Sequence, residues 1–181
     1  MTSRQFDPRH LDVRRLAAEG AELSGEWPLR ELARLCDAAA AERPPTAADR
    51  VAWNVRGEQT GGVEPQIWID LDARTALAVQ CQRCLAPMDV DVRVSRRFRF
   101  VAGEVAAAQL DAESEDDVLA LARDVDLQEL VEDELLLALP IVPMHAECPE
   151  PLTRTEADDE PAPAPSPFAV LASLRRETPD S

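Results

Sequence analysis

The stretch from Cys81 to Phe100 constrains the fold of this chain more than any other segment. It begins with a Cys-x-x-Cys turn and continues as a run in which apolar and polar side chains alternate. Alternation with a period of two is the pattern of a β-strand that buries one of its faces. Leu77 and Val79 extend the same period to the near side of the turn. The sequence therefore predicts a strand, a tight turn and a long return strand.

The alternation divides the return strand into two rows of side chains. The apolar row is Met88, Val90, Val92, Val94, Phe98 and Phe100. The polar row is Asp89, Asp91, Arg93, Ser95, Arg97 and Arg99. Arg96 interrupts the apolar row, which predicts a bulge, a bend or the end of the covered surface at that residue.

Two more alternating runs, at 51–55 and 67–71, predict further strands joined by short loops. Several strands at this spacing indicate an antiparallel sheet that curls or closes into a partial barrel. The clearest helix covers 126–139, where Asp126 caps the start and an apolar stripe faces one side. We expect this C-terminal helix to cover the sheet, which makes the fold class α+β.

The rest of the chain gives weaker signals. A helix is expected at 28–40, with Pro28 at its first position, and a shorter one at 10–19. Residues 20–26 have the composition of a turn. Residues 103–124 have the composition of a loop, with a short edge strand at 118–121.

Composition divides the chain into four parts. Residues 1–27 are interpreted as an N-terminal arm and 28–148 as the α+β domain. Residues 149–165 are rich in proline, alanine and acids, and are expected to form a disordered linker. Residues 166–181 are expected to form a short amphipathic docking segment. Its partner-binding residues would be Phe168, Leu171 and Leu174.

Charge is distributed unevenly along the 181 residues, whose formal net charge is −16. All 19 basic residues are arginine, and 15 of them fall in residues 1–103 together with 15 of the 35 acids. The remaining 4 arginines and 20 acids lie beyond residue 103 and supply the whole excess. An acidic excess repels bare nucleic acid at long range. It leaves open a local arginine surface for RNA, or an acidic segment that binds a basic protein.

The chain has the features of a cytoplasmic protein. Its first residues contain no apolar core of a secretory signal, and no apolar run approaches the length of a membrane span. Four cysteines without an export signal predict reduced thiols rather than a disulfide framework.

Four residues have the types and spacing of a zinc site. Cys81 and Cys84 form half of a zinc knuckle, and His145 with Cys148 can supply the other half. The alternative is a turn whose two thiols lie at a sheet edge without metal. A redox pair of the thioredoxin type is disfavoured, because that chemistry uses a helix N-terminus and this pair lies between strands.

The arginines of the long strand are candidate RNA-binding residues, namely Arg93, Arg96, Arg97 and Arg99. Such a row can contact phosphates. It fits equally a solvated strand face that pairs with local acids. Trp53 and Trp68 can stack on bases or pack in the core.

The sequence gives little support to catalysis. It contains no Gly-rich phosphate loop and no nucleophile elbow, and its carboxylates cluster in helices and loops as solvated charge. We therefore expect no enzyme activity and no small-molecule substrate. An RNA-binding factor and a protein–protein adaptor are the two remaining classes.

Three segments together resemble the bacterial YceD family, the large ribosomal RNA subunit accumulation proteins. They are the Cys81-Gln-Arg-Cys84 turn, residues 131–145 and residues 167–175, in the same order and at similar separations. The resemblance covers most of residues 25–176. It implies a cytosolic, non-catalytic factor that maintains 23S rRNA through its synthesis, processing or stability. Its partners would be 23S rRNA or its precursors, contacted directly or through a pre-ribosomal or rRNA-processing protein. The alternative from the residues alone is a small zinc-binding protein–protein adaptor without RNA contact.

Overall fold

The computed structural model describes residues 6–62 and 64–149. In chain order the elements are α1 (Val13–Glu19), β1 (Glu22–Pro28), the 3-10 turn η1 (Leu29–Glu31), α2 (Ala33–Asp37), β2 (Arg50–Gln59), β3 (Ile67–Gln80), β4 (Pro87–Val101), α3 (Glu104–Glu113), β5 (Asp117–Ala120) and α4 (Leu127–Leu137). The expected linker and docking segment, with Phe168, Leu171 and Leu174, lie outside the described residues and stay predictions.

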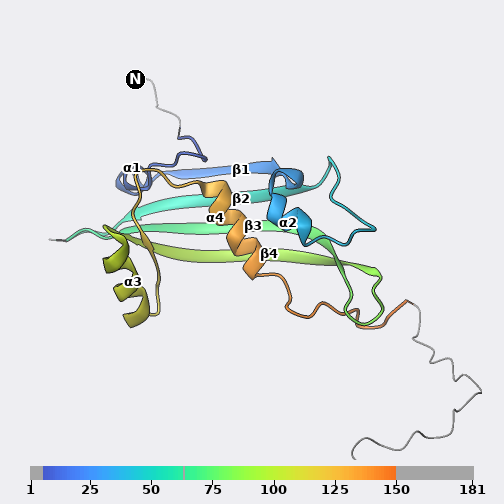
Figure 1. The fold of residues 1–181 in the computed structure, drawn as a ribbon. Coiled ribbons are helices and arrows are strands. Elements are labelled where there is room, and N and C mark those ends of the chain that lie inside the picture. The colour runs from blue at the N-terminus through green and yellow to red at the C-terminus, as the bar shows by residue number, and fades with distance from the viewer. Residues whose placement is uncertain (1–5, 63, 150–181) are drawn as a thin grey trace, which may run out of the picture. The chain divides into compact units, whose positions relative to one another are not determined.

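The strands form one mixed sheet in the order β1-β2-β3-β4-β5 (Figure 1). The first four strands are antiparallel neighbours, and β5 pairs with β4 in parallel. The α+β fold class and the long strand pair around the cysteine turn are confirmed. The sheet is not closed into a barrel, so the partial barrel, one of the two expected forms, is not formed, and the parallel strand β5 makes the sheet mixed rather than antiparallel.

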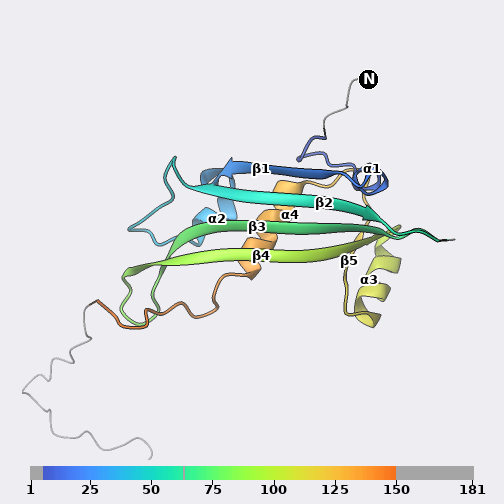
Figure 2. The ribbon, with the colours of Figure 1, turned by 180° about the vertical axis from the view of Figure 1, so that it is seen from behind.

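Helices α1, α2 and α4 lie on one face of the sheet, and the opposite face of β1 to β4 is open (Figures 1 and 2). The covered face carries the apolar row of each strand, including Val55, Ile69 and Leu71, which are fully buried. Gly57 lies where α1 crosses β2. A Cβ atom at Gly57 would lie 2.5 Å from the backbone carbon of Leu16, so only glycine permits this close approach.

The N-terminal third differs from the sequence prediction in two ways. Residues 22–28, which overlap the segment 20–26 interpreted as a turn, form an edge strand that pairs with residues 50–56 of β2. The indole rings of Trp27 and Trp53 stack there at 4.6 Å, and this contact between distant residues holds β1 on the sheet. Pro28 ends the strand instead of starting a helix, and the expected helix at 28–40 is reduced to η1 and the five-residue α2.

The expected loop at 103–124 is also wrong in part. Its first half forms α3, which packs beside β5 and returns the chain so that β5 runs parallel to β4. Helix α3 has no buried apolar stripe, since Ala107 is its one buried residue. The periodic signal that identifies a helix in a sequence is therefore missing.

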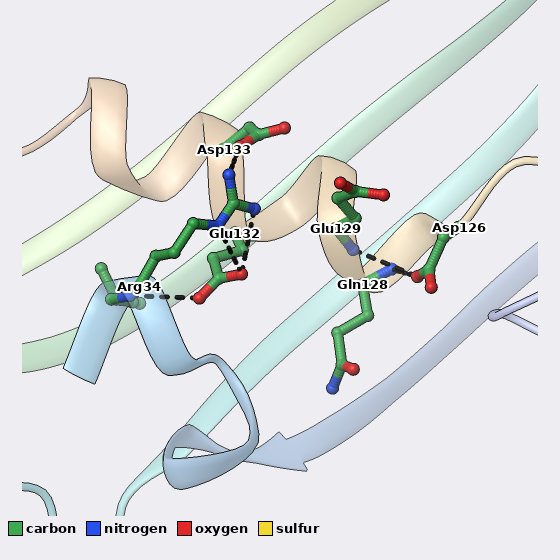
Figure 3. A network of polar contacts seen from close by, with 7 residues as sticks. Arg34, Asp126, Gln128, Glu129, Glu132 and Asp133 are labelled. Carbon is green, nitrogen blue, oxygen red and sulfur yellow. Dashed lines mark hydrogen bonds and ion pairs between the residues drawn. The ribbon is translucent and has the colours of Figure 1, made fainter. Parts of the chain in front are cut away.

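Helix α4 confirms the strongest helix prediction. The carboxylate of Asp126 accepts hydrogen bonds from the backbone N–H groups of Gln128 and Glu129 at 2.9 and 3.1 Å (Figure 3). This is the N-cap interaction that satisfies free amides at a helix start. Val131 and Leu135 are fully buried against the sheet. The helix therefore closes the core as expected.

Two acidic side chains of α4, those of Glu132 and Glu134, are buried beside its apolar stripe. Glu132 accepts a hydrogen bond from the backbone N–H of Leu35 at 3.1 Å and pairs with the Arg34 guanidinium at 3.0 Å (Figure 3). Asp133 pairs with the same guanidinium from a more exposed position. A buried carboxylate needs such partners, because desolvation without them is costly. These contacts join α4 to α2.

Glu134 explains the arginine in the apolar row of β4. The β3–β4 register runs through Arg96 without interruption, so the bulge, one of the three alternatives expected there, is excluded. Arg96 instead projects to the covered face, where its Nε lies 3.2 Å from Glu134. Burial raises the pKa of Glu134, and the charge and hydrogen bond of Arg96 oppose that rise. The ion pair between Arg96 and Glu134 therefore anchors α4 to β4 of the sheet.

We expect Leu135→Ala to lower the free energy of unfolding by about 2–5 kcal/mol, because Leu135 is fully buried between α4 and the sheet. Leu137→Ala is the matched control, since Leu137 belongs to the same helix but is 73% exposed. Urea unfolding of the two variants measures the difference. Equal losses would contradict the assigned buried face of α4.

We expect Glu132→Ala to destabilise the domain by about 1–3 kcal/mol, because it leaves the N–H of Leu35 without its acceptor. Asp133→Ala removes a charge from the neighbouring position and should have a smaller effect, since Asp133 has no such backbone contact among the described residues. Thermal and urea unfolding of both variants compare them at equal net charge. A larger loss in the Asp133 variant would rule out the backbone acceptor as the main contribution.

Candidate metal centre and charged sheet face

The turn between β3 and β4 is a compact knuckle built around Cys81. The N–H of Cys81 donates to the carbonyl of Ala86 at 3.0 Å, and the N–H of Leu85 donates to the carbonyl of Cys81 at 2.9 Å. Leu85 has a φ of 64°, in the left-handed region that leucine rarely adopts. The knuckle therefore keeps a backbone conformation that glycine would adopt more easily, which indicates strong local constraint.

The chain after α4 returns to this knuckle. The N–H of Gln82 donates to the carbonyl of Pro143 at 2.8 Å, and the N–H of His145 donates to the Sγ of Cys81 at 3.4 Å. The Nδ1 of His145 lies 3.4 Å from the Sγ of Cys84. The two halves of the candidate metal site, which lie far apart in the sequence, are thus joined by backbone and side-chain contacts.

The structure brings all four predicted ligands together. The ligand atoms of Cys81, Cys84, His145 and Cys148 lie within 4.8 Å of one another. Cys81 is buried and the other three are half-buried. Tetrahedral zinc with Zn–S bonds of about 2.3 Å requires ligand atoms about 3.8 Å apart. Three thiols and one imidazole whose ligand atoms lie within 4.8 Å of one another have the residue types and the approximate spacing of a structural zinc site.

The surroundings of Cys81 favour its thiolate. Burial alone would raise its pKa, but N–H groups of Cys84, His145 and Arg83 and the Cys84 side chain bring the pKa down to about 5. Burial and the neighbouring Cys84 and Cys81 groups raise the pKa of Cys148. Crowded thiols cannot all ionise without a cation between them. The cluster has the electrostatics expected of a cation-binding site.

The predicted arginine row divides between the two faces of the sheet. Arg96 lies on the covered face with Glu134, away from the other three. Arg97 lies on the open face and is neutralised there by Glu58 at 2.6 Å and Asp70 at 3.6 Å. Arg93 is exposed on the open face. The four arginines do not form one continuous surface.

The two candidate stacking tryptophans are both nearly buried. Trp53 is 7% exposed and stacks on Trp27 at the covered face. Trp68 is 9% exposed, and the guanidinium groups of Arg97 and Arg99 lie 4.9 and 5.8 Å from its ring. Cation–π contacts of this kind occupy the ring face that a base would use. Neither indole is free to stack on RNA.

The open face also holds a residue that the sequence reasoning missed. Arg74 of β3 lies directly opposite Arg93 of β4. A hollow of about 540 Å³ surrounds this pair. It is lined by Ala52, Trp53, Asn54, Asp72, Ala73, Arg74, Arg93, Val94 and Ser95. Arg74 follows the polar parity of β3, so this parity was the available signal, but the pairing register that places it opposite Arg93 depends on the turn.

Fold and site together define an α+β protein with one open sheet face and a cluster of three cysteines and one histidine at a β-knuckle. Residues 69–175 match the family described as "Large ribosomal RNA subunit accumulation protein YceD". The chain belongs to the YceD family. A relative from Haemophilus influenzae, named "Large ribosomal RNA subunit accumulation protein YceD", is 33% identical over 122 residues. The alignment covers 64% of this chain and 70% of the relative.

No solved structure matches the chain. Among the helices of the described residues, none combines the length and the apolar character that a bilayer crossing requires.

Proposed function

We propose that this chain is a non-catalytic factor that supports accumulation of large-subunit ribosomal RNA in the cytoplasm. The observation that carries the proposal is the family match over residues 69–175. That region contains the cysteine knuckle, the interrupted apolar row of β4 and the whole of α4. The match therefore extends over the elements that build both the core and the cysteine–histidine cluster.

The proposed mode of action is binding, either to 23S rRNA and its precursors or to a protein that processes them. The large exposed surfaces support binding: the sheet has one face without helices, and that face carries arginines. Two carboxylates on it, Asp70 and Glu58, are exposed partners of Arg97. Such pairs suit a solvated surface better than acid–base catalysis, which needs displaced pKa values at a shared site.

The second candidate function is that of a zinc-stabilised adaptor for other proteins. The close approach of Cys81, Cys84, His145 and Cys148 favours it. Zinc at these ligands would fasten the segment after α4 to the β3–β4 knuckle and would supply stability rather than chemistry, since all four positions come from the protein. The two candidates are compatible, because a structural metal can support an RNA-binding domain as well as an adaptor.

Protein purified without chelator should contain about one zinc per chain, and Cys81→Ser should release it and lower the melting temperature. Elemental analysis and thermal unfolding with and without EDTA measure the two effects. Cys36→Ser is the control, because the Cys36 thiol donates to the carbonyl of Leu29 in a different part of the fold. Metal-free protein of unchanged melting temperature would end the zinc proposal.

Residues 166–181 are proposed to dock on a partner through Phe168, Leu171 and Leu174. The segment from Ser166 to Arg176 is amphipathic in sequence and is separated from the described domain by a linker of proline, alanine and acids. A helix of about eleven residues is marginal alone in water, so a partner surface is needed to stabilise it. The end of the family match at residue 175 supports a role for this segment.

In a strain that lacks its own YceD protein, the full chain should restore the level of 23S rRNA relative to 16S rRNA. Deletion of residues 166–181, or Phe168→Asp combined with Leu171→Asp, should abolish the restoration and leave the melting temperature of the domain nearly unchanged. Deletion of residues 177–181 alone is the control and should restore fully. Failure of the full chain would contradict the proposed function. Full restoration by the longer deletion would contradict the role of the docking segment.

A further inference from the structure

We propose that the hollow on the open sheet face binds one unstacked nucleotide of single-stranded RNA, with its phosphate between Arg74 and Arg93. The inference rests on the proposed function, because it gives the RNA contact a location. It differs from the arginine row expected from the sequence, since it uses Arg74 and leaves out Arg96, Arg97 and Arg99.

The first support is an uncompensated pair of like charges. Arg74 and Arg93 are direct cross-strand partners. Like charges in this position destabilise a sheet. Neither guanidinium has a hydrogen-bond or ion-pair partner among the described residues, whereas Arg97, two rows away on the same face, has two carboxylates. An anion bound between Arg74 and Arg93 would relieve the repulsion and supply the missing acceptors.

The second support is the shape of the surface. The side chains of Ala52 and Ser95 are short, and they lie on the open face beside the two long arginine side chains. The resulting hollow of about 540 Å³ falls within the range of about 300–1,000 Å³ that is usual for small-molecule sites. A single nucleotide fits this size, whereas a double helix is too wide and rigid to enter.

The third support is the set of hydrogen-bond acceptors at the other end of the hollow. Asp72 and Asn54 are cross-strand partners there. The Nδ2 of Asn54 donates one hydrogen bond to Glu22 at 2.7 Å, which leaves its second N–H and its carbonyl oxygen, the acceptor, for a ligand. Two acceptors call for donors, and a ribose 2′-hydroxyl or a base amino group supplies them.

The arrangement of the two ends selects the class of ligand. Asp72 lies two residues from Arg74 on β3, a distance of about 7 Å along the strand. One phosphate at the arginines and one hydroxyl at Asp72 therefore belong to a single nucleotide. A run of carboxylates in an acidic peptide would meet Asp72 with like charge. RNA is also favoured over DNA, because DNA lacks the 2′-hydroxyl.

The test is binding of a fluorescent single-stranded RNA of mixed sequence to the full chain, measured by anisotropy over a salt series. We expect Arg74→Gln combined with Arg93→Gln to weaken binding at low salt at least tenfold. The slope of log affinity against log salt should fall by about 0.7, because the two arginines share one phosphate of a single strand. Asp72→Ala should reduce the ratio of the affinity for single-stranded RNA to the affinity for single-stranded DNA of the same sequence.

The control removes the same charge elsewhere. Arg30→Gln combined with Arg123→Gln changes two exposed arginines outside the hollow and should leave the salt slope unchanged. Far-UV circular dichroism checks that each variant is folded, and the single variants at Arg74 and Arg93 should each give an intermediate effect. Equal losses in the two double variants would overturn the proposal, as would absence of RNA binding by the natural sequence or tighter binding of a poly-glutamate peptide.

The outcome is separable from that of the proposed function. If the chain restores 23S rRNA in cells but the Arg74→Gln and Arg93→Gln double variant binds RNA normally, only the nucleotide site is wrong. If the chain fails to restore 23S rRNA yet binds RNA through Arg74 and Arg93, the proposed function is wrong and the site stands.

Discussion

The position of α4 on the sheet is the constraint on which the remaining structure depends. Apolar side chains hold the helix against the strands, but apolar contact alone is not directional and would permit it to slide. Glu132 reaches the backbone of α2, and Glu134 reaches Arg96 in the middle of β4. Buried polar groups of this kind act where geometry must be unique, since a displaced helix would leave them without partners. The fixed helix also decides where the following chain leaves the core.

That exit gives the domain two differently built surfaces. At the end of α4 the chain turns towards the β3–β4 knuckle, which is why His145 and Cys148 arrive beside Cys81 and Cys84. All the helices that cover the core lie on one side, so the other side of the sheet keeps its strand side chains exposed (Figure 2). One surface is therefore a rigid knuckle joined to the end of the described domain. The other is a broad, charged face whose arginines differ in how far they are neutralised.

The sequence was sufficient where the information is local. The period of two identified the strands on either side of the cysteine turn, and the period of an amphipathic helix with its Asp126 cap identified α4. It was insufficient where a residue depends on a distant partner. Arg96 looked like a defect in the apolar row because its acid lies 38 residues later. Strand β1 was missed because the stacking of Trp27 on Trp53 holds it in place, and α3 was missed because it buries almost nothing. The four metal-ligand residues were predicted from type and spacing, whereas their convergence, across 61 residues, required the path of the chain after α4.

The order of elements along the chain has a consequence for how the domain is made. Strands β1 to β4 are neighbours in space in the order in which they are synthesised, so they can pair through local hairpins as they emerge. Their common cover, α4, comes after all of them and joins α2 through contacts between residues 98 apart. Contacts over such separations form late, because a long loop must close first. During synthesis, the apolar face of the sheet therefore stays partly exposed until α4 has been made. In that interval the nascent chain can associate with other proteins through this face.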